Sequence, residues 1–324
     1  MKEEMRMSVI LVISQLMAKV GEKVQGLVQV PGTNVMMPVT LINGVQSGKT
    51  ILITAGVHGC EYPGIKTVME LAKEIDPSEV KGQLILVHPV NTQAFVQRTA
   101  TLVPEDGKNL LRVFPGNQEG TISEKIAYFM TQEMISLADF YFDIHGGDLH
   151  EDLIPHLYYP GAANKEVVQA SIEVAKLFNV PYYVKSSLTT GTYTSAAVLN
   201  ETPSLLIERG GCGLCEEEVV LAYKQDLFNV LTSMNVLSRQ MDIDKCEPIE
   251  ITEAVYLDSL YDGCWTCFVK AGQWIKAGDP LGEVTDYFGN IIETYYANFD
   301  AVVLYQTVAY SITKGSSLVA YGRQ

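Results

Sequence analysis

The chain has 324 residues, long for one domain, and its 47% hydrophobic and 19% charged composition is that of a globular protein. A formal net charge of −15 argues against a nucleic-acid partner, because an acidic chain repels a phosphate backbone. The apolar run at residues 9–13 is too short to cross a bilayer, and no small-residue cleavage site follows it. We therefore expect a cytoplasmic protein with an N-terminal strand and no membrane partner. Homo-oligomerisation stays open.

Strand and helix signals alternate over residues 1–245, which predicts an α/β domain with a mixed sheet flanked by helices. Apolar runs predict buried strands at residues 50–55, 84–87, 139–144 and 204–207. Helices are predicted from Pro63, after the capping-box pattern Thr121-Ile122-Ser123-Glu124, over 166–178 and over 216–237. Residues 246–324 hold short β-branched and aromatic runs between Gly, Asp and Pro, which predicts a smaller all-β domain.

Residues of types that bind metals lie at the end of three predicted strands or shortly after it. His58 and Glu61 follow the first, His145 ends the second, and Glu208 ends the third. Sites in open α/β sheets form beyond the carboxyl ends of strands, so these side chains are expected to meet. Two histidines and one glutamate make a three-ligand zinc site with an open position, and a second glutamate nearby is a candidate base. Nitrogen and oxygen ligands also suit cobalt or nickel.

Each of these residues has a simpler interpretation. A lone His-x-x-Glu pair often lies on a solvated surface, and His145 could merely cap its strand. Glu208 could form an ion pair with Arg209. The pairs Cys212/Cys215 and Cys264/Cys267 could bind a structural zinc, but they lie farther apart than usual zinc-ribbon pairs, which favours free thiols.

A long turn-rich segment, residues 98–116, lies between the first two metal-ligand motifs. Such loops inside a compact domain usually have a function. It contains Arg98 and Arg112, and arginine binds carboxylates or stabilises a developing oxyanion. Alternatively, both arginines are ordinary surface residues.

Several motifs in the same order resemble the succinylglutamate desuccinylase/aspartoacylase family, which is related to the zinc carboxypeptidases. They are Gly56-Val57-His58-Gly59-Cys60-Glu61, the loop at residues 106–116, Asp143-Ile144-His145-Gly146-Gly147-Asp148 and Glu208. Two C-terminal segments, at residues 276–282 and 286–290, resemble the β-barrel-like tail domain of bacterial members. The resemblance covers most of the chain, from about residue 20 onward. It implies a zinc carboxypeptidase-like sheet with a barrel-like C-terminal domain.

The resemblance also implies roles for individual residues. His58, Glu61 and His145 would bind one zinc ion, and Glu208 would be the general base. A further set would act on the substrate: Arg98 would polarise the scissile carbonyl, and Arg112 and Asn109 would bind the substrate. The family usually has Asn-Leu-Asn-Arg where this chain has Asn109-Leu110-Leu111-Arg112, and leucine cannot donate a hydrogen bond.

These residues predict a zinc-dependent amidohydrolase that removes an acyl group from a small N-acylated amine or amino acid. Because Leu111 replaces a polar residue, a less anionic substrate than N-acetylaspartate or succinylglutamate is expected. One alternative is a metallocarboxypeptidase that acts on peptides or cell-wall fragments. Another is a non-catalytic metal- or ligand-binding protein on the same fold, which Leu111 and Ala100 would favour.

Overall fold

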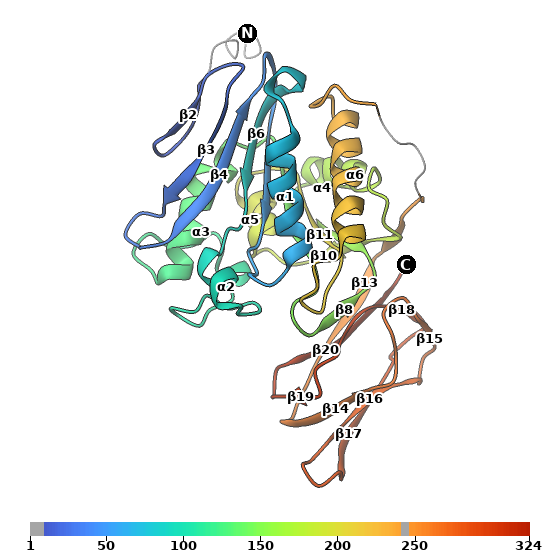
Figure 1. The fold of residues 1–324 in the computed structure, drawn as a ribbon. Helices are drawn as coiled ribbons and strands as arrows, with labels where there is room; N and C mark the ends of the chain where they lie inside the picture. Colours follow the sequence, from blue (N-terminus) through green and yellow to red (C-terminus); the bar gives the residue numbers. More distant parts are fainter. Residues whose placement is uncertain (1–9, 241–245) are drawn as a thin grey trace.

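A nine-stranded mixed sheet forms the centre of the larger part of the molecule (Figure 1). The structure is a computed structural model that describes residues 10–240 and 246–324. The strands of this sheet are β3 (Lys23–Gln29), β4 (Met36–Asn43), β5 (Gln46–Ala55), β6 (Lys81–Val87), β7 (Phe140–His145), β9 (His156–Pro160), β10 (Tyr182–Ser186), β11 (Ser204–Glu208) and β12 (Ile249–Ile251). Their order is β12-β10-β9-β11-β7-β5-β6-β4-β3, with the four central strands β11, β7, β5 and β6 parallel.

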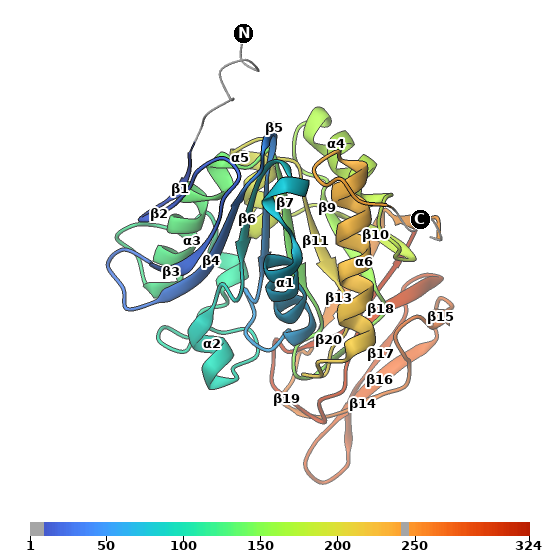
Figure 2. The ribbon, with the colours of Figure 1, turned by 45° about the horizontal axis from the view of Figure 1, so that its top comes forward.

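Helices cover both faces of this sheet (Figures 1 and 2). They are α1 (Tyr62–Glu74), α2 (Thr92–Gln97), α3 (Ile122–Glu133), α4 (Lys165–Ala175), α5 (Thr192–Leu199) and α6 (Glu217–Ser233), with short 3-10 turns η2 (Pro77–Glu79), η3 (Leu110–Val113) and η4 (Ile135–Leu137). α1, α4 and α6 pack on one face, and α3 and α5 on the other. No helix in the described part of the chain has the length and apolar character needed to cross a membrane.

Successive side chains of a strand point to opposite faces of the sheet, so each strand contributes to the hydrophobic core on both faces. In β7, Phe140, Phe142 and Ile144 pack under α1 and α6, whereas Tyr141 packs on the opposite side, toward α3 and α5. Asp143 and His145 follow Tyr141 at intervals of two, so they point to the same side as Tyr141. The register of β7 against β11 places Glu208 opposite His145, which brings the two predicted functional side chains to one end of the sheet.

The remaining strands form two smaller antiparallel sheets that lie below the α/β part in Figure 1. One contains β13 (Glu253–Asp258), β20 (Ser317–Arg323), β18 (Ala301–Thr307) and β15 (Trp274–Ile275), and β8 (Glu151–Leu153) pairs with β18. The other contains β17 (Ile291–Tyr296), β16 (Pro280–Thr285), β14 (Gly263–Cys267) and β19 (Ser311–Ile312). Trp265, Leu281, Val303 and Tyr321 pack between them as a separate core.

The predicted fold class is confirmed, with differences at element ends. The N-terminal hairpin comprises β1 (Leu11–Ile13) and β2 (Leu16–Ala18); Val9 lies outside the described residues. The helix predicted over 216–237 ends at Ser233, and Asn235 then adopts a left-handed conformation with φ 59°.

The helix predicted over 166–178 likewise ends early, at Ala175. Beyond it, Leu177 N donates to Val174 O and Phe178 N to Ala175 O, the three-residue spacing of a tightened last turn. The predicted division between residues 245 and 246 falls at the end of a segment, 241–245, outside the described residues, and it stays a prediction.

Candidate functional site

His58, Glu61 and His145 come together at the carboxyl ends of β5 and β7. Their ligand atoms all lie within 4.8 Å of one another, and all three residues are buried. Glu61 bridges the two rings, with Oε1 2.7 Å from His58 Nδ1 and Oε2 3.0 Å from His145 Nδ1. The imidazole centroids are 5.0 Å apart and nearly perpendicular, so both Nδ1 atoms and the carboxylate converge on a small volume.

Close backbone packing holds His58 and Glu61 in place. They lie on the loop between β5 and α1, where Gly59 passes so near α2 that a Cβ atom there would be 2.4 Å from the Ala94 carbonyl carbon. Pro63 then occupies the first turn of α1, where its missing N–H costs no helical hydrogen bond. The loop conformation is therefore fixed by the neighbouring helix, independently of any ligand.

The outer nitrogens of both histidines are engaged by other residues. His145 Nε2 donates to Asp143 Oδ2 at 3.0 Å. His58 Nε2 lies 3.1 Å from Asn109 Oδ1, which also accepts a hydrogen bond from Leu111 N at 3.0 Å. Because Asn109 Oδ1 and Asp143 Oδ2 are acceptors, the Nε2 atoms are the donors, and the Nδ1 atoms of both rings face the Glu61 carboxylate.

Asp143 is fully buried and held from three directions. Besides His145, it accepts a hydrogen bond from Thr54 Oγ1 at 2.7 Å and another from the hydroxyl of Thr192 at the start of α5. The Thr54 hydroxyl also lies 2.8 Å from Tyr141 Oη. Sequence reasoning missed both threonines, because nothing local brings residues 54 and 192 beside residue 143.

The electrostatics of the cluster favour an ionised Glu61. Burial raises the pKa of this carboxyl, but the adjacent His145 and His58 outweigh burial and lower its pKa to about 2. Burial alone would lower the pKa of His145, whereas Asp143 and Glu61 together raise it well above its usual range. The three side chains thus form a pre-organised pocket whose carboxylate is charged and attracts a cation.

Glu208 lies at the end of β11, on the same side of the sheet as His145. Its Oε2 atom is buried and has no hydrogen-bond partner within the described residues. Burial raises its pKa well above the usual range, opposed by His145 and reinforced by Glu61. The alternative ion pair with Arg209 is not formed, since Arg209 Nη2 lies 2.6 Å from Asp226 Oδ2. Glu208 is therefore available to interact with bound water or substrate.

The segment that contains Arg98 and Arg112 is more exposed than the cluster of His58, Glu61 and His145. Arg98 ends α2 in a left-handed conformation, φ 55°, and Arg112 lies in η3; both side chains are exposed. Within the described residues neither forms an ion pair. Arg98 is close enough to the ligand loop that its charge opposes the burial that raises the pKa of the Cys60 thiol.

A carboxylate that sequence reasoning missed is Glu151, the first residue of β8. Burial raises its pKa to about 8, and the negative charges of Asp148 and Glu61 act in the same direction. The chain reverses sharply before it, so that a Cβ atom at Gly147 would be 2.3 Å from the Glu151 carbonyl oxygen. The signal in the sequence was an acidic residue three positions after Asp148, in the motif that contains His145.

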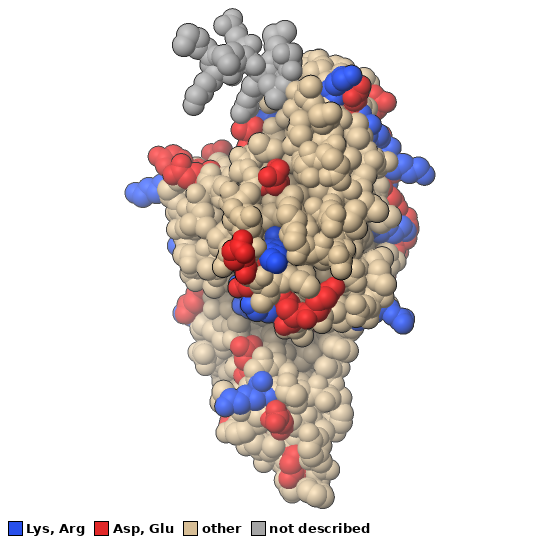
Figure 3. Space-filling model, turned by 90° about the vertical axis from the view of Figure 1, so that its left-hand side faces the viewer, with Lys and Arg blue, Asp and Glu red and all other residues tan. Residues whose placement is uncertain are grey.

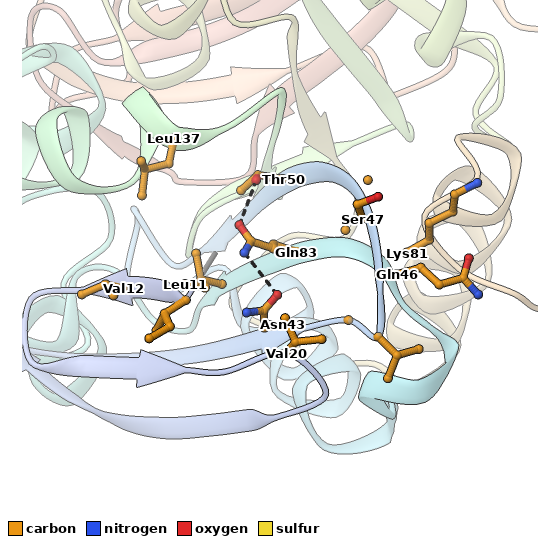
Figure 4. A pocket seen from close by; sticks show the side chains of 15 residues that line it. Leu11, Val12, Val20, Asn43, Gln46, Ser47, Thr50, Lys81, Gln83 and Leu137 are labelled. Carbon is orange, nitrogen blue, oxygen red and sulfur yellow. Dashed lines mark hydrogen bonds between the residues drawn. The ribbon is translucent and has the colours of Figure 1, made fainter. Parts of the chain in front are cut away.

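The other candidate sites have less support. All six cysteines are free thiols, and among the described residues no group containing cysteine has metal-binding geometry. A cavity of about 670 Å³ lies at the amino ends of β5 and β6 (Figure 4). The histidines lie at the opposite, carboxyl ends of β5 and β7. The Thr50, Gln83 and Asn43 side chains in it are hydrogen-bonded to one another, and its other walls are mainly apolar or backbone.

The residues present fit a metal ion. Two imidazole nitrogens and one carboxylate converge, which is the ligand set of many catalytic zinc sites. Glu61 Oε2 is buried and, although 3.0 Å from His145 Nδ1, forms no hydrogen bond with acceptable geometry.

Comparison with known proteins identifies the family. The model of the succinylglutamate desuccinylase/aspartoacylase catalytic domain matches residues 47–234, and the chain belongs to this family. It is therefore a hydrolase that acts on amide C–N bonds and removes an acyl group from a small N-acylated amine or amino acid.

Individual relatives give more detail. The chain is 28% identical over 292 residues to the N-alpha-acetyl-L-2,4-diaminobutyric acid deacetylase of Halomonas elongata, a match covering 88% of this chain and 84% of the relative. The product-bound structure of the ectoine utilization protein EutE (DoeB) from Ruegeria pomeroyi has a TM-score of 0.85 and 26% identity, covering 98% of this chain and 99% of that one. A succinylglutamate desuccinylase/aspartoacylase from Rhodobacter sphaeroides has a TM-score of 0.81 and 25% identity, with 93% and 96% covered.

Proposed function

We propose that this deacylase uses a single zinc ion held by His58, Glu61 and His145. The observation that carries the proposal is the convergence of both Nδ1 atoms and the Glu61 carboxylate, with Asp143 and Asn109 holding the outer nitrogens. Zinc bound there would supply Lewis acidity, lowering the pKa of a bound water and polarising the substrate's carbonyl group.

Glu208 is the general base and proton carrier in this proposal. Its unpartnered, buried Oε2 takes a proton from the attacking water as the water oxygen bonds to the acyl carbon. The same carboxyl then gives that proton to the leaving nitrogen as the C–N bond breaks. The products are a carboxylic acid and an amine. A raised pKa suits this role, because the group must hold the proton between the two transfers.

The exposed arginines bind the substrate in this scheme. We assign Arg112 to a carboxylate of the substrate and Arg98 to the oxygen of the scissile carbonyl, where negative charge develops. Asn109 has two roles in this scheme. Its Oδ1 accepts the hydrogen bond from His58 Nε2 and so orients that ring, and the NH₂ group of the same side chain donates a hydrogen bond to the substrate. Within the described residues neither arginine has an ion-pair partner, which leaves both guanidinium groups available.

The preferred substrate carries little negative charge. Leu111 offers no hydrogen bond for a second carboxylate, while the partly buried Glu151 and the neighbouring Asp148 favour a positive group. The relative from Halomonas elongata acts on an N-acetylated diamino acid, according to its name. We propose that this chain also removes the acyl group from an amino acid or amine that has a second, free amino group.

A substrate panel tests the proposal. Purified protein with measured zinc content is given N-acetyl, N-succinyl and N-formyl derivatives of diamino acids and of aspartate, and released primary amine is quantified. The proposal predicts turnover of the diamino acid derivatives in preference to those of aspartate. Release of a free C-terminal amino acid from peptides would instead indicate a carboxypeptidase. Full zinc occupancy without any turnover would indicate a binding protein on this fold. The cytoplasmic location stays a prediction.

A further inference from the structure

Two tyrosines of the C-terminal sheet face the α/β part of the molecule. Tyr256 of β13 and Tyr305 of β18 are both paired with Ala320 of the intervening strand β20. A bulge precedes Tyr305, and packing shows the side to which this residue points, because it contacts an apolar cluster that contains Ala320 and Val184 of β10. Tyr256 points to the same side as Ala320, where β13 lies next to the large sheet (Figure 1).

A third tyrosine continues this row into the α/β part. The ring centroid of Tyr158, on β9, lies 6.5 Å from that of Tyr256, and the Tyr256 and Tyr305 centroids are also 6.5 Å apart. A cation that lies between two rings at this spacing can be within about 6 Å of both centroids, which is the range of cation–π attraction. Tyr256 is 48% exposed, so the middle of the row is open to solvent.

Glu208 lies beside the first two rings of the row. Tyr158 is paired with Leu206 of β11, two residues before Glu208, so these three side chains point to the same face of the large sheet. Burial is the main cause of the raised pKa values of Tyr158 and Tyr256, and the negative charge of Glu208 also raises both. The row of tyrosines therefore begins next to the residue assigned as the general base.

Glu151 lies at the other end of the row. In the pairing of β8 with β18, Leu153 faces Tyr305 and Glu151 faces Thr307. Glu151 is thus a diagonal neighbour of Tyr305 on the same face of the sheet, a separation that long side chains can span. Burial raises the pKa of Tyr305, and the charge of Glu151 raises it further. A cation bound at the Tyr305 ring would therefore have a carboxyl group beside it.

Two unpartnered polar atoms next to the row are hydrogen-bond acceptors. His156 is fully buried, and its ring centroid lies 5.0 Å from that of Tyr158. Its Nδ1 donates to Ile154 O at 2.7 Å, so Nε2 is an acceptor, and this atom has no partner among the described residues. Glu208 Oε2 is the second such atom. A ligand that suits this place carries donors, and an ammonium group has three donors and no acceptor.

The charge of the protein favours the same kind of ligand. The net charge is −15, and Figure 3 shows Asp and Glu side chains (red) on both the upper and the lower part of one face. An electrostatic field of this sign attracts positive groups and repels a second carboxylate. The faces of tyrosine rings are also electron-rich, so they attract a cation and not an anion.

We propose that Tyr158, Tyr256 and Tyr305 form the binding site for the free ammonium group of the substrate. Glu151 is the ion-pair partner of that group. This inference rests on the proposed function and adds to it that the C-terminal sheet supplies two of the three rings that select the substrate. If the tyrosines only packed the two parts of the molecule together, their loss would affect ligands with and without an ammonium group alike.

The test compares two deacylation products, 2,4-diaminobutyrate and norvaline, which has a methyl group in place of the second ammonium group. Calorimetry on protein of measured zinc content gives the dissociation constant of each product without any turnover. We expect the wild type to bind 2,4-diaminobutyrate about tenfold more tightly than norvaline. Tyr256→Leu, which removes the ring, should reduce this preference about fivefold, whereas Tyr256→Phe, which keeps the ring, should retain it.

Tyr310→Leu is the matched control, because Tyr310 is 67% exposed between β18 and β19, outside the row, and both constants should stay unchanged. A wild type without the preference, an unchanged preference in Tyr256→Leu, an equal loss in Tyr256→Leu and Tyr256→Phe, or a loss caused by Tyr310→Leu would each overturn the inference. The hydrolysis panel tests the proposed function separately. A wild type that binds with this preference but hydrolyses no diamino acid derivative would support the inference and contradict the proposed function alone.

Discussion

The ligand cluster and the arginine segment lie side by side but are built in opposite ways. His58, Glu61 and His145 are buried, and the outer nitrogen of each ring is hydrogen-bonded. Arg98 and Arg112 are exposed and lack ion pairs within the described residues. In the proposed mechanism, the strands thus fix the groups assigned to hydrolysis, whereas the arginines assigned to substrate binding are exposed and have no ion-pair partner among the described residues.

The largest expected effect is at the base. Glu208→Gln should lower kcat by about 10²–10⁴, because an amide cannot accept the proton, while zinc content measured by mass spectrometry stays the same. The folded protein should be no less stable, since the substitution removes a buried, unpaired carboxyl. Near-normal turnover in this variant would mean that another residue is the base.

The second largest effect tests the hydrogen bond from His145 to Asp143, which holds the ring in the buried cluster. Asp143→Ala should weaken zinc binding by about 10–100-fold, because His145 loses the acceptor that orients its ring. Competition with a chromogenic chelator measures this affinity. Thr192→Ser keeps the hydroxyl that Asp143 accepts from and serves as a control with nearly unchanged affinity. Equal zinc affinity in Asp143→Ala and the wild type would contradict the role assigned to this carboxylate.

The third effect tests the exposed segment. Arg112→Ala should raise KM by about tenfold through loss of the carboxylate contact, with little change in kcat. Its free energy of unfolding should change by no more than about 0.5 kcal/mol, because the side chain is exposed. Arg98→Ala should act mainly on kcat instead. A large loss of stability in either variant would show that the two regions are not as different as described.

The smallest effect concerns Glu151 and pH. Burial raises its folded-state pKa from 4.5 to about 8, so the native protein holds this proton more tightly than the unfolded chain. The resulting stability is present below pH 4.5 and is lost as the pH rises toward 8. Glu151→Gln removes this dependence and should become more stable than the metal-free wild type at pH 8, by on the order of 1 kcal/mol after allowance for solvent screening. Urea unfolding at pH 5 and pH 8 measures the difference, and parallel curves would refute it.

The sequence predicted those parts of the fold and of the candidate site that are determined by residues close together in the chain. Apolar runs located β5, β7 and β11, and the strand ends located His145 and Glu208, because a strand's carboxyl end follows from its own residues. The hydrogen bonds of Asp143 with Thr54 and Thr192, and of Asn109 with His58, were not predictable in this way. They join segments far apart in the chain, and their geometry depends on the register of the sheet and the path of a long loop.

The two parts of the molecule exchange short strands. β8, which follows directly after the His145 motif, completes the C-terminal sheet beside β18, and β12, from the start of the C-terminal segment, lies at the edge of the large sheet beside β10. Each part is thus incomplete without a piece of the other. A chain cut short before residue 246 would leave β8 without its neighbour and disturb Glu151, so truncation of the tail should inactivate the catalytic half. We expect the intact protein to unfold on heating in one cooperative transition, because neither part can unfold without disrupting the other.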